Sequence, residues 1–328
     1  MFIRTFKKNY TLQLILIIVL PLLLWFPAFL SSPELIKTDY DAPLYLLIYN
    51  TFASSKLLST LIAFALVLIQ GIVLNSIFAY NQLSSRNTLL PAFIFILLQS
   101  TNYHSMTISS ALIFNTFLII SLYFIFKSFD KNEGLDEIFN VSLFISLAFL
   151  TYIPAILLLI WLLLSFLNYR FYKWRYWLVS FFGLLTPILI IAVYYFLTDS
   201  FPLVYSKYIT NLDFIPNFYV TLKPIEIIFY ITIGVFTLVS LYNTISSKGD
   251  CNINYRKKTN ILIILLFVTS LISFYCIGKC FITTFLAISL SYLFFNFFTS
   301  KRKLIYSNIF FAILLLLIIT KLILSLQE

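Results

Sequence analysis

The chain has 328 residues, of which 61% are hydrophobic and 10% are charged, and its mean hydropathy is +0.99. Soluble domains are about a quarter charged, so this composition excludes a soluble globular protein. It predicts an all-α, polytopic integral membrane protein. The formal net charge of +10 raises the question of a nucleic-acid partner, which the positions of the basic residues answer.

The basic residues follow a membrane topology. Of the 22 Lys and Arg residues, 16 fall in alternate loops that we assign to the inner side: Arg4, Lys7, Lys8, Arg86, Lys127, Lys131, Arg170, Lys173, Arg175, Lys248, Arg256, Lys257, Lys258, Lys301, Arg302 and Lys303. The positive-inside rule predicts this asymmetry. We therefore expect no nucleic-acid partner, an N-terminus inside and a C-terminus outside.

Apolar segments that can cross a bilayer, which takes about 20 residues, recur along the whole chain. The segment 138–168 is split at Tyr152-Ile153-Pro154, because a single crossing would place the basic cluster after it outside. The eleven expected spans cover residues 11–30, 57–80, 88–101, 108–126, 138–152, 153–168, 177–197, 224 onward, 261–277, 280–298 and 304–319. Residues 1–328 therefore form a single transmembrane domain, in which 246–260 is a basic inner loop.

Two outer loops are long enough to carry a site. The first, residues 31–55, contains the segment DAPLYLLIYNTF, which is too short to cross a bilayer and predicts a helix lying at the membrane surface. The second, residues 198–223, is rich in aromatic and turn residues.

The first outer loop also carries three acids, Glu34, Asp39 and Asp41. In an extended loop Asp39 and Asp41 point the same way. They would then hold a divalent cation such as Mg²⁺ or Mn²⁺, or one of them would act as a general base. On the spacing alone we favour a solvated acidic loop for the same residues.

Three residues are candidates to bind the phosphate of a substrate near the outer headgroups. Lys56 follows the surface segment, Lys207 lies in the second outer loop, and His104 lies in the polar turn STNYHSM. His104 is the single histidine of the chain. It also fits an ordinary polar position at a helix end.

The predicted spans contain no charged residue at their centres, which counts against an ion-coupled transporter. Four uncharged polar residues lie within them: Gln70, Asn75, Asn115 and Asn140. They would line a transport pathway or form hydrogen bonds between helices, and we favour the second use.

The chain resembles an uncharacterised family of bacterial multi-spanning membrane proteins. The resemblance rests on the segments FKKNYTLQLILIIVLPLLLWFPAFL, NTLLPAFIFILLQS, IFNVSLFISLAFLTYIPAILLLIWLLL and LNYRFYKWRYWLVSFFGLLTPILIIAVYYFLTD. It implies a multi-pass protein of the bacterial inner membrane and names no activity.

The first third more distantly resembles the GT-C glycosyltransferases, polytopic enzymes that use polyprenyl-phosphate-linked sugars. In that superfamily an acidic residue precedes a surface helix in the first outer loop. The matching stretch is TDYDAPLYLLIYNTF, so the resemblance implies Asp41 as the base, with Asp39 or Glu34 binding a metal or positioning the acceptor. It also implies that the loop around Lys207 closes over the donor.

The resemblance implies a GT-C-like glycosyltransferase that uses a polyprenyl-phosphate-linked sugar at the outer membrane face, for an envelope glycan or a glycoprotein. Two other functions are open: a flippase or transporter for a lipid-linked or amphipathic substrate, and a non-catalytic membrane subunit of an envelope assembly. Membrane lipids are partners under every reading.

Overall fold

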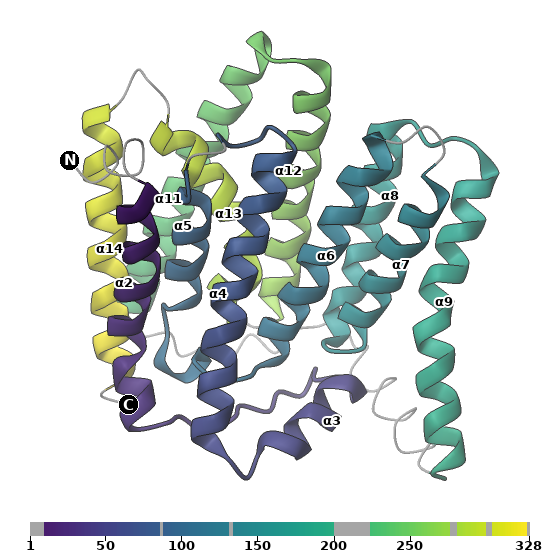
Figure 1. The fold of residues 1–328 in the computed structure, drawn as a ribbon, viewed down its shortest axis with the longest axis horizontal. Coiled ribbons are helices and arrows are strands. Elements are labelled where there is room, and N and C mark those ends of the chain that lie inside the picture. The colour runs from purple at the N-terminus through teal and green to yellow at the C-terminus, as the bar shows by residue number, and fades with distance from the viewer. Residues whose placement is uncertain are drawn as a thin grey trace.

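The computed structural model describes residues 10–85, 88–130, 134–199, 224–275, 281–299 and 304–326. These residues are almost entirely helical and contain no β-strand (Figure 1). The α-helices are α2 (Tyr10–Leu30), α3 (Pro43–Phe52), α4 (Lys56–Tyr80), α5 (Leu90–Gln99), α6 (Ser110–Asp130), α7 (Leu135–Phe149), α8 (Leu158–Tyr169), α9 (Trp174–Leu197), α11 (Pro224–Ser247), α12 (Ile253–Phe274), α13 (Ile282–Thr299) and α14 (Leu304–Leu326). Three short 3₁₀ helices are η1 (Tyr103–Ser105), η2 (Ile153–Leu157) and η3 (Lys248–Asp250).

Eight of the described helices are long and apolar enough to cross a membrane: α2, α4, α6, α9, α11, α12, α13 and α14. They stand side by side, while α3 lies across their lower ends in Figure 1. We call this end of the bundle the α3 end and the other the opposite end. The fold is that of a polytopic membrane protein.

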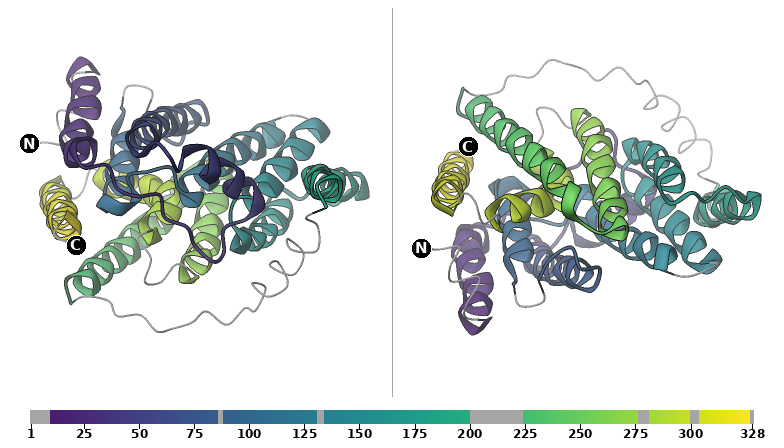
Figure 2. Two further views of the ribbon diagram at one scale, coloured as in Figure 1. Left: turned by 90° about the horizontal axis from the view of Figure 1, so that it is seen from below. Right: turned by 90° about the horizontal axis from the view of Figure 1, so that it is seen from above.

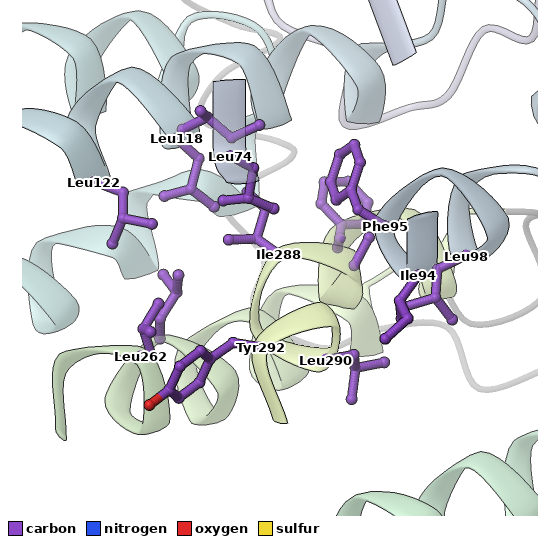
Figure 3. Packing of buried hydrophobic residues seen from close by; sticks show 14 of the residues in the cluster. Leu74, Ile94, Phe95, Leu98, Leu118, Leu122, Leu262, Ile288, Leu290 and Tyr292 are labelled. Atoms are coloured by element: carbon purple, nitrogen blue, oxygen red, sulfur yellow. The ribbon is translucent and has the colours of Figure 1, made fainter. Parts of the chain in front are cut away.

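The core of the bundle is built around α5 and α13. All residues of α5 are buried, and α13 packs against α5, α6, α11 and α12. Figure 3 shows side chains of α5, such as Phe95, close to Ile288 and Leu290 of α13, with Leu118 of α6 and Leu74 of α4 beside them. Since α5 is only 10 residues long, or about 15 Å, neighbouring helices rather than lipid surround it.

At the other side of the molecule α9 forms an edge and packs on α7 (Figure 2). Ser142 of α7 donates a hydrogen bond to Ser180 of α9, 2.9 Å away. A Cβ atom added to Gly183 would lie 2.6 Å from the carbonyl oxygen of Phe139. Small residues therefore let these two helices approach closely, as is common between helices in membranes.

The helix expected within residues 31–55 and the split of the long apolar segment are both confirmed, while the position of that helix at the membrane surface stays a prediction. The DAPLYLLIYNTF segment forms α3, and α7 and α8 are separate helices joined through η2. The expected basic loop 246–260 is wrong in its second half, because α12 begins at Ile253. Its Arg and Lys side chains are good helix formers, so the helix extends beyond the apolar segment.

Candidate functional site

The loop between α2 and α3 makes a tight turn at its acids. The Oγ1 and the backbone N–H of Thr38 donate to the two carboxylate oxygens of Asp41, at 2.7 Å and 2.5 Å. The backbone N–H of Asp41 donates in return to the carbonyl of Thr38 at 3.2 Å. Asp41 is buried, with 1% of its surface exposed, whereas Asp39 is exposed. The extended loop with two parallel carboxylates is therefore wrong, because the turn separates them.

The turn is fixed to the break between α7 and α8. Residues Asp41 and Tyr152 form an isolated antiparallel bridge. Backbone hydrogen bonds run from Ala42 N to Thr151 O at 3.1 Å, from Leu44 N to Leu150 O at 3.0 Å, and from Ile153 N to Tyr40 O at 2.9 Å. The tip of the α7–α8 break thus satisfies backbone groups of the loop, which are costly to leave unpaired when buried.

Tyr45 anchors α3 beneath this turn. Its ring is fully buried, and its hydroxyl lies 3.0 Å from the carbonyl of Ile36 and 3.2 Å from that of Ile108. Burial, and then the charge of Asp41, raise the pKa of Tyr45 well above its usual range. The phenol therefore stays protonated and keeps donating to the loop.

Two of the predicted site residues pair with each other. Lys56 Nζ lies 2.8 Å from Glu34 Oε1, and both side chains are largely exposed. The hydrogen bond and the charge of Lys56 lower the pKa of Glu34. Glu34 and Lys56 form a surface ion pair at the α3 end.

His104 lies in η1, with its ring 5.5 Å from that of Tyr103 in an edge contact. Tyr103 connects three parts of the chain, since its hydroxyl donates to the carbonyl of Ser31 and its N–H donates to Ser325 Oγ of α14 at 3.0 Å. His104 therefore neighbours the first residue of the loop. The prediction for Lys207 concerns a residue outside the described ranges.

An apolar groove of about 430 Å³ runs between α11, α12 and α13. On α12 it is lined from Leu266 to Phe274, and on α13 from Ile282 to Leu290. These are the halves of both helices nearer the α3 end, so the groove belongs to that half of the bundle.

The end of the groove meets the turn through aromatic rings. Phe274 lines the groove, and the next residue, Tyr275, packs edge-on against Tyr40 with ring centroids 5.7 Å apart. Tyr40 also packs edge-on against Tyr152 at 6.4 Å. The turn, the α7–α8 break and the groove therefore adjoin one another.

The acids of the loop do not fit a metal ion. Both oxygens of Asp41 already accept hydrogen bonds from Thr38, and Asp41 is buried whereas Asp39 is exposed. No group of three or more His, Cys, Asp or Glu side chains within the described residues could hold a metal. We therefore derive no step through Mg²⁺ or Mn²⁺.

The buried amides connect helices, as favoured from the sequence. Gln70 of α4 donates to the carbonyl of Leu112 of α6 at 2.9 Å. Asn115 of α6 donates to the carbonyl of Thr284 of α13 at 2.7 Å. These donors are used in packing, which confirms hydrogen bonding between helices for these two residues.

Sequence reasoning missed Thr38, Tyr40 and the partner segment around Thr151. The spacing Thr38-Asp39-Tyr40-Asp41 offers a local signal, because a hydroxyl and a carboxylate three residues apart close a turn through hydrogen bonds. The pairing of this turn with the segment around Thr151, more than a hundred positions away, leaves no signal in a single sequence.

No protein-family model, curated protein or solved structure matches this chain. The class is defined by the fold: the chain is a multi-pass, all-helical membrane protein with an ordered loop and an adjoining apolar groove at one end.

Proposed function

We propose that this protein is a GT-C-like glycosyltransferase of the bacterial cytoplasmic membrane, with its site at the α3 end. The supporting observation is the contact between Tyr40 and Tyr275, which brings the acidic turn to the end of the apolar groove. A polyprenyl chain in the groove would leave its phosphate and sugar beside the turn.

We also propose that the α3 end faces outward and that eleven helices cross the membrane. The eight long helices would be joined by the shorter α5, α7 and α8, with flanking residues completing each crossing. Among the described residues, eight basic ones lie at the opposite end: Lys127, Arg170, Lys173, Arg175, Lys248, Arg256, Lys257 and Lys258. Three lie at the α3 end: Lys37, Lys56 and Lys321. The positive-inside rule favours this orientation.

In the proposed reaction Asp39 is the better base and Asp41 the positioning residue. Asp39 is exposed, so an acceptor hydroxyl can reach it, while Asp41 is buried and holds Thr38. The acceptor oxygen forms a bond to the anomeric carbon as the bond from that carbon to the lipid phosphate breaks. The phosphate leaves with the electron pair, and the hydroxyl proton passes to the carboxylate of Asp39.

A flippase receives less support. It would need a path through both halves of the bundle, whereas the groove lies in the half at the α3 end, and Gln70 and Asn115 are engaged in helix packing. If substitution of the acidic loop residues leaves sugar transfer unchanged, the reading as a non-catalytic membrane subunit takes its place.

The test uses purified protein in lipid nanodiscs, polyprenyl-phosphate hexoses with labelled sugars as donors, and a membrane extract as acceptor. Asp39→Asn should abolish release of the label from the lipid, while the matched variant Glu34→Gln should retain it. Full transfer by Asp39→Asn would remove Asp39 from the mechanism. No transfer by the unaltered protein with any donor would contradict the enzyme proposal.

The groove is tested separately by Gly234→Phe. Gly234 lines the groove, and a Cβ added to it meets no atom within 4 Å, so the backbone there can carry a side chain that occupies the groove. We expect loss of binding of undecaprenyl phosphate with an unchanged melting temperature. Unchanged binding would contradict the groove as the lipid site.

A further inference from the structure

A second cavity lies at the opposite end of the bundle, away from the proposed glycosyl-transfer site. Its volume is about 620 Å³, within the range of about 300–1,000 Å³ of small-molecule sites. The last residues of α4 and α6 and the first turns of α12 surround it. Its lining is mainly polar, in contrast to the groove between α11, α12 and α13.

The floor of the cavity is an ion pair that connects three helices. Lys258 Nζ of α12 donates to Asn81 Oδ1 at 2.8 Å and to the two carboxylate oxygens of Asp130 at 2.9 Å and 3.0 Å. The Lys258 side chain is 7% exposed. An ammonium group has three N–H donors, so these acceptors occupy Lys258 and its charge balances that of Asp130.

The rim of the cavity carries amide side chains. Gln82, Asn252 and Asn254 line it and are exposed. Within the described residues, no hydrogen bond engages these three side chains, and Asn252, the residue before α12, does not cap the helix through its side chain. Tyr80 and Tyr255 add two phenol rings to the lining.

Each amide offers both a donor and an acceptor. An anion would use the donors alone and would meet the carboxylate of Asp130. A cation would use the acceptors alone and would meet Lys258. A hydroxyl group also donates and accepts, so a ligand with several hydroxyl groups uses both halves of every amide.

We propose that this cavity binds an uncharged polyhydroxylated ligand, of the class of a sugar ring. The amides would bond to neighbouring hydroxyl groups, and the faces of the tyrosine rings would cover the apolar face of the ring. The balanced pair of Lys258 and Asp130 would contribute acceptor and donor groups without net charge. The inference is independent of the glycosyl-transfer proposal, because it concerns other residues at the other end of the bundle.

A free thiol at the rim provides the assay. Cys251 lines the cavity and is partly exposed. In a Cys276→Ala/Cys280→Ala background it is the single thiol of the chain. The rate at which a fluorescent maleimide labels it is measured in nanodiscs, without glycoside detergents. Glucose, galactose, mannose, N-acetylglucosamine and inorganic phosphate are added as probes.

At least one of the four sugars should slow labelling in a saturable way. For a dissociation constant on the order of 10 mM, about 100 mM sugar slows labelling about tenfold, through the factor 1 + [L]/Kd. The double variant Asn252→Ala/Asn254→Ala should lose this protection with an unchanged melting temperature. A control thiol placed by Asn50→Cys on α3, at the other end, in a chain whose three natural cysteines are replaced by Ala, should react at the same rate with and without sugar.

Any of three results would overturn the proposal, and the first two concern the ligand. One is labelling that none of the four sugars slows, and the other is protection by phosphate in place of the sugars. Protection that persists in the double variant would also overturn it, since the amides would then have no part in binding. None of these results bears on transfer of labelled sugar at the α3 end.

Discussion

Thr38 and Asp41 form a closed unit in which a buried carboxylate accepts two hydrogen bonds from one residue. Burying a charge is costly unless hydrogen bonds compensate it, so the two residues depend on each other. This unit closes the turn that contains the exposed Asp39 and Tyr40, whose ring packs against Tyr275. Its contribution can be measured directly.

Thr38→Val removes the hydroxyl donor and leaves the backbone donor to Asp41 in place. A hydrogen bond to a charged group contributes about 1.5–3 kcal/mol, so we expect a loss of about 2 kcal/mol in the free energy of unfolding, measured by denaturation in detergent. The matched control is Thr51→Val, whose exposed hydroxyl bonds within α3 to the carbonyl of Ile48. Equal stability of the two variants would show that the Thr38 hydroxyl does not support Asp41.

The pair of Glu34 and Lys56 makes a pH-dependent contribution of known sign. Lys56 lowers the pKa of Glu34 in the folded protein. The stabilisation by the pair is therefore present above the ordinary glutamate pKa of about 4.3, and it is lost as the pH falls through the lowered pKa of the folded state. Because the pair is exposed, we expect Glu34→Gln to leave the melting temperature at pH 7 nearly unchanged. A large decrease there would mean that the pair is shielded from solvent.

At the scale of helices, the contact of α7 with α9 depends on residues without bulk. Gly183→Val would push a side chain into the carbonyl of Phe139, which is backbone and cannot rotate away. We expect a loss of about 1–3 kcal/mol, as for other overpacked sites, and a lower melting temperature. Gly234→Val is the control, since it has open space around the added atoms; equal losses would mean that α7 and α9 are not in close contact.

Most helices could be predicted because hydrophobic length is a property of local sequence. α2, α4, α5 and α9 begin and end within a few residues of the expected positions, and Tyr152-Ile153-Pro154 was recognised as a break from charge alone. α12 was predicted to start too late because a helix need not stop where its apolar segment stops. The ion pair between Lys258 and Asp130 forms where α12 meets the end of α6. A single sequence gives no information on which helices meet.

For the molecule as a whole, the two ends should be accessible from opposite sides of the membrane. In the Cys276→Ala/Cys280→Ala background, Cys251 should react with a membrane-impermeant maleimide only after the cells are permeabilised. A thiol introduced by Asp39→Cys should react in intact cells, because Asp39 is exposed at the α3 end. The reverse labelling pattern would show that the topology is inverted, with each proposed site on the other side of the membrane.

The buried centre of the bundle also determines when the protein can be completed during synthesis. α5 is among the first helices made and is too short to cross a bilayer alone, yet its partner α13 follows about 190 residues later. At a synthesis rate of about 5–20 residues per second, α5 waits for roughly ten seconds or longer without the surface that α13 supplies. The core is therefore completed late in synthesis, and a chain that ends before α13 would leave the α13-facing side of α5 uncovered.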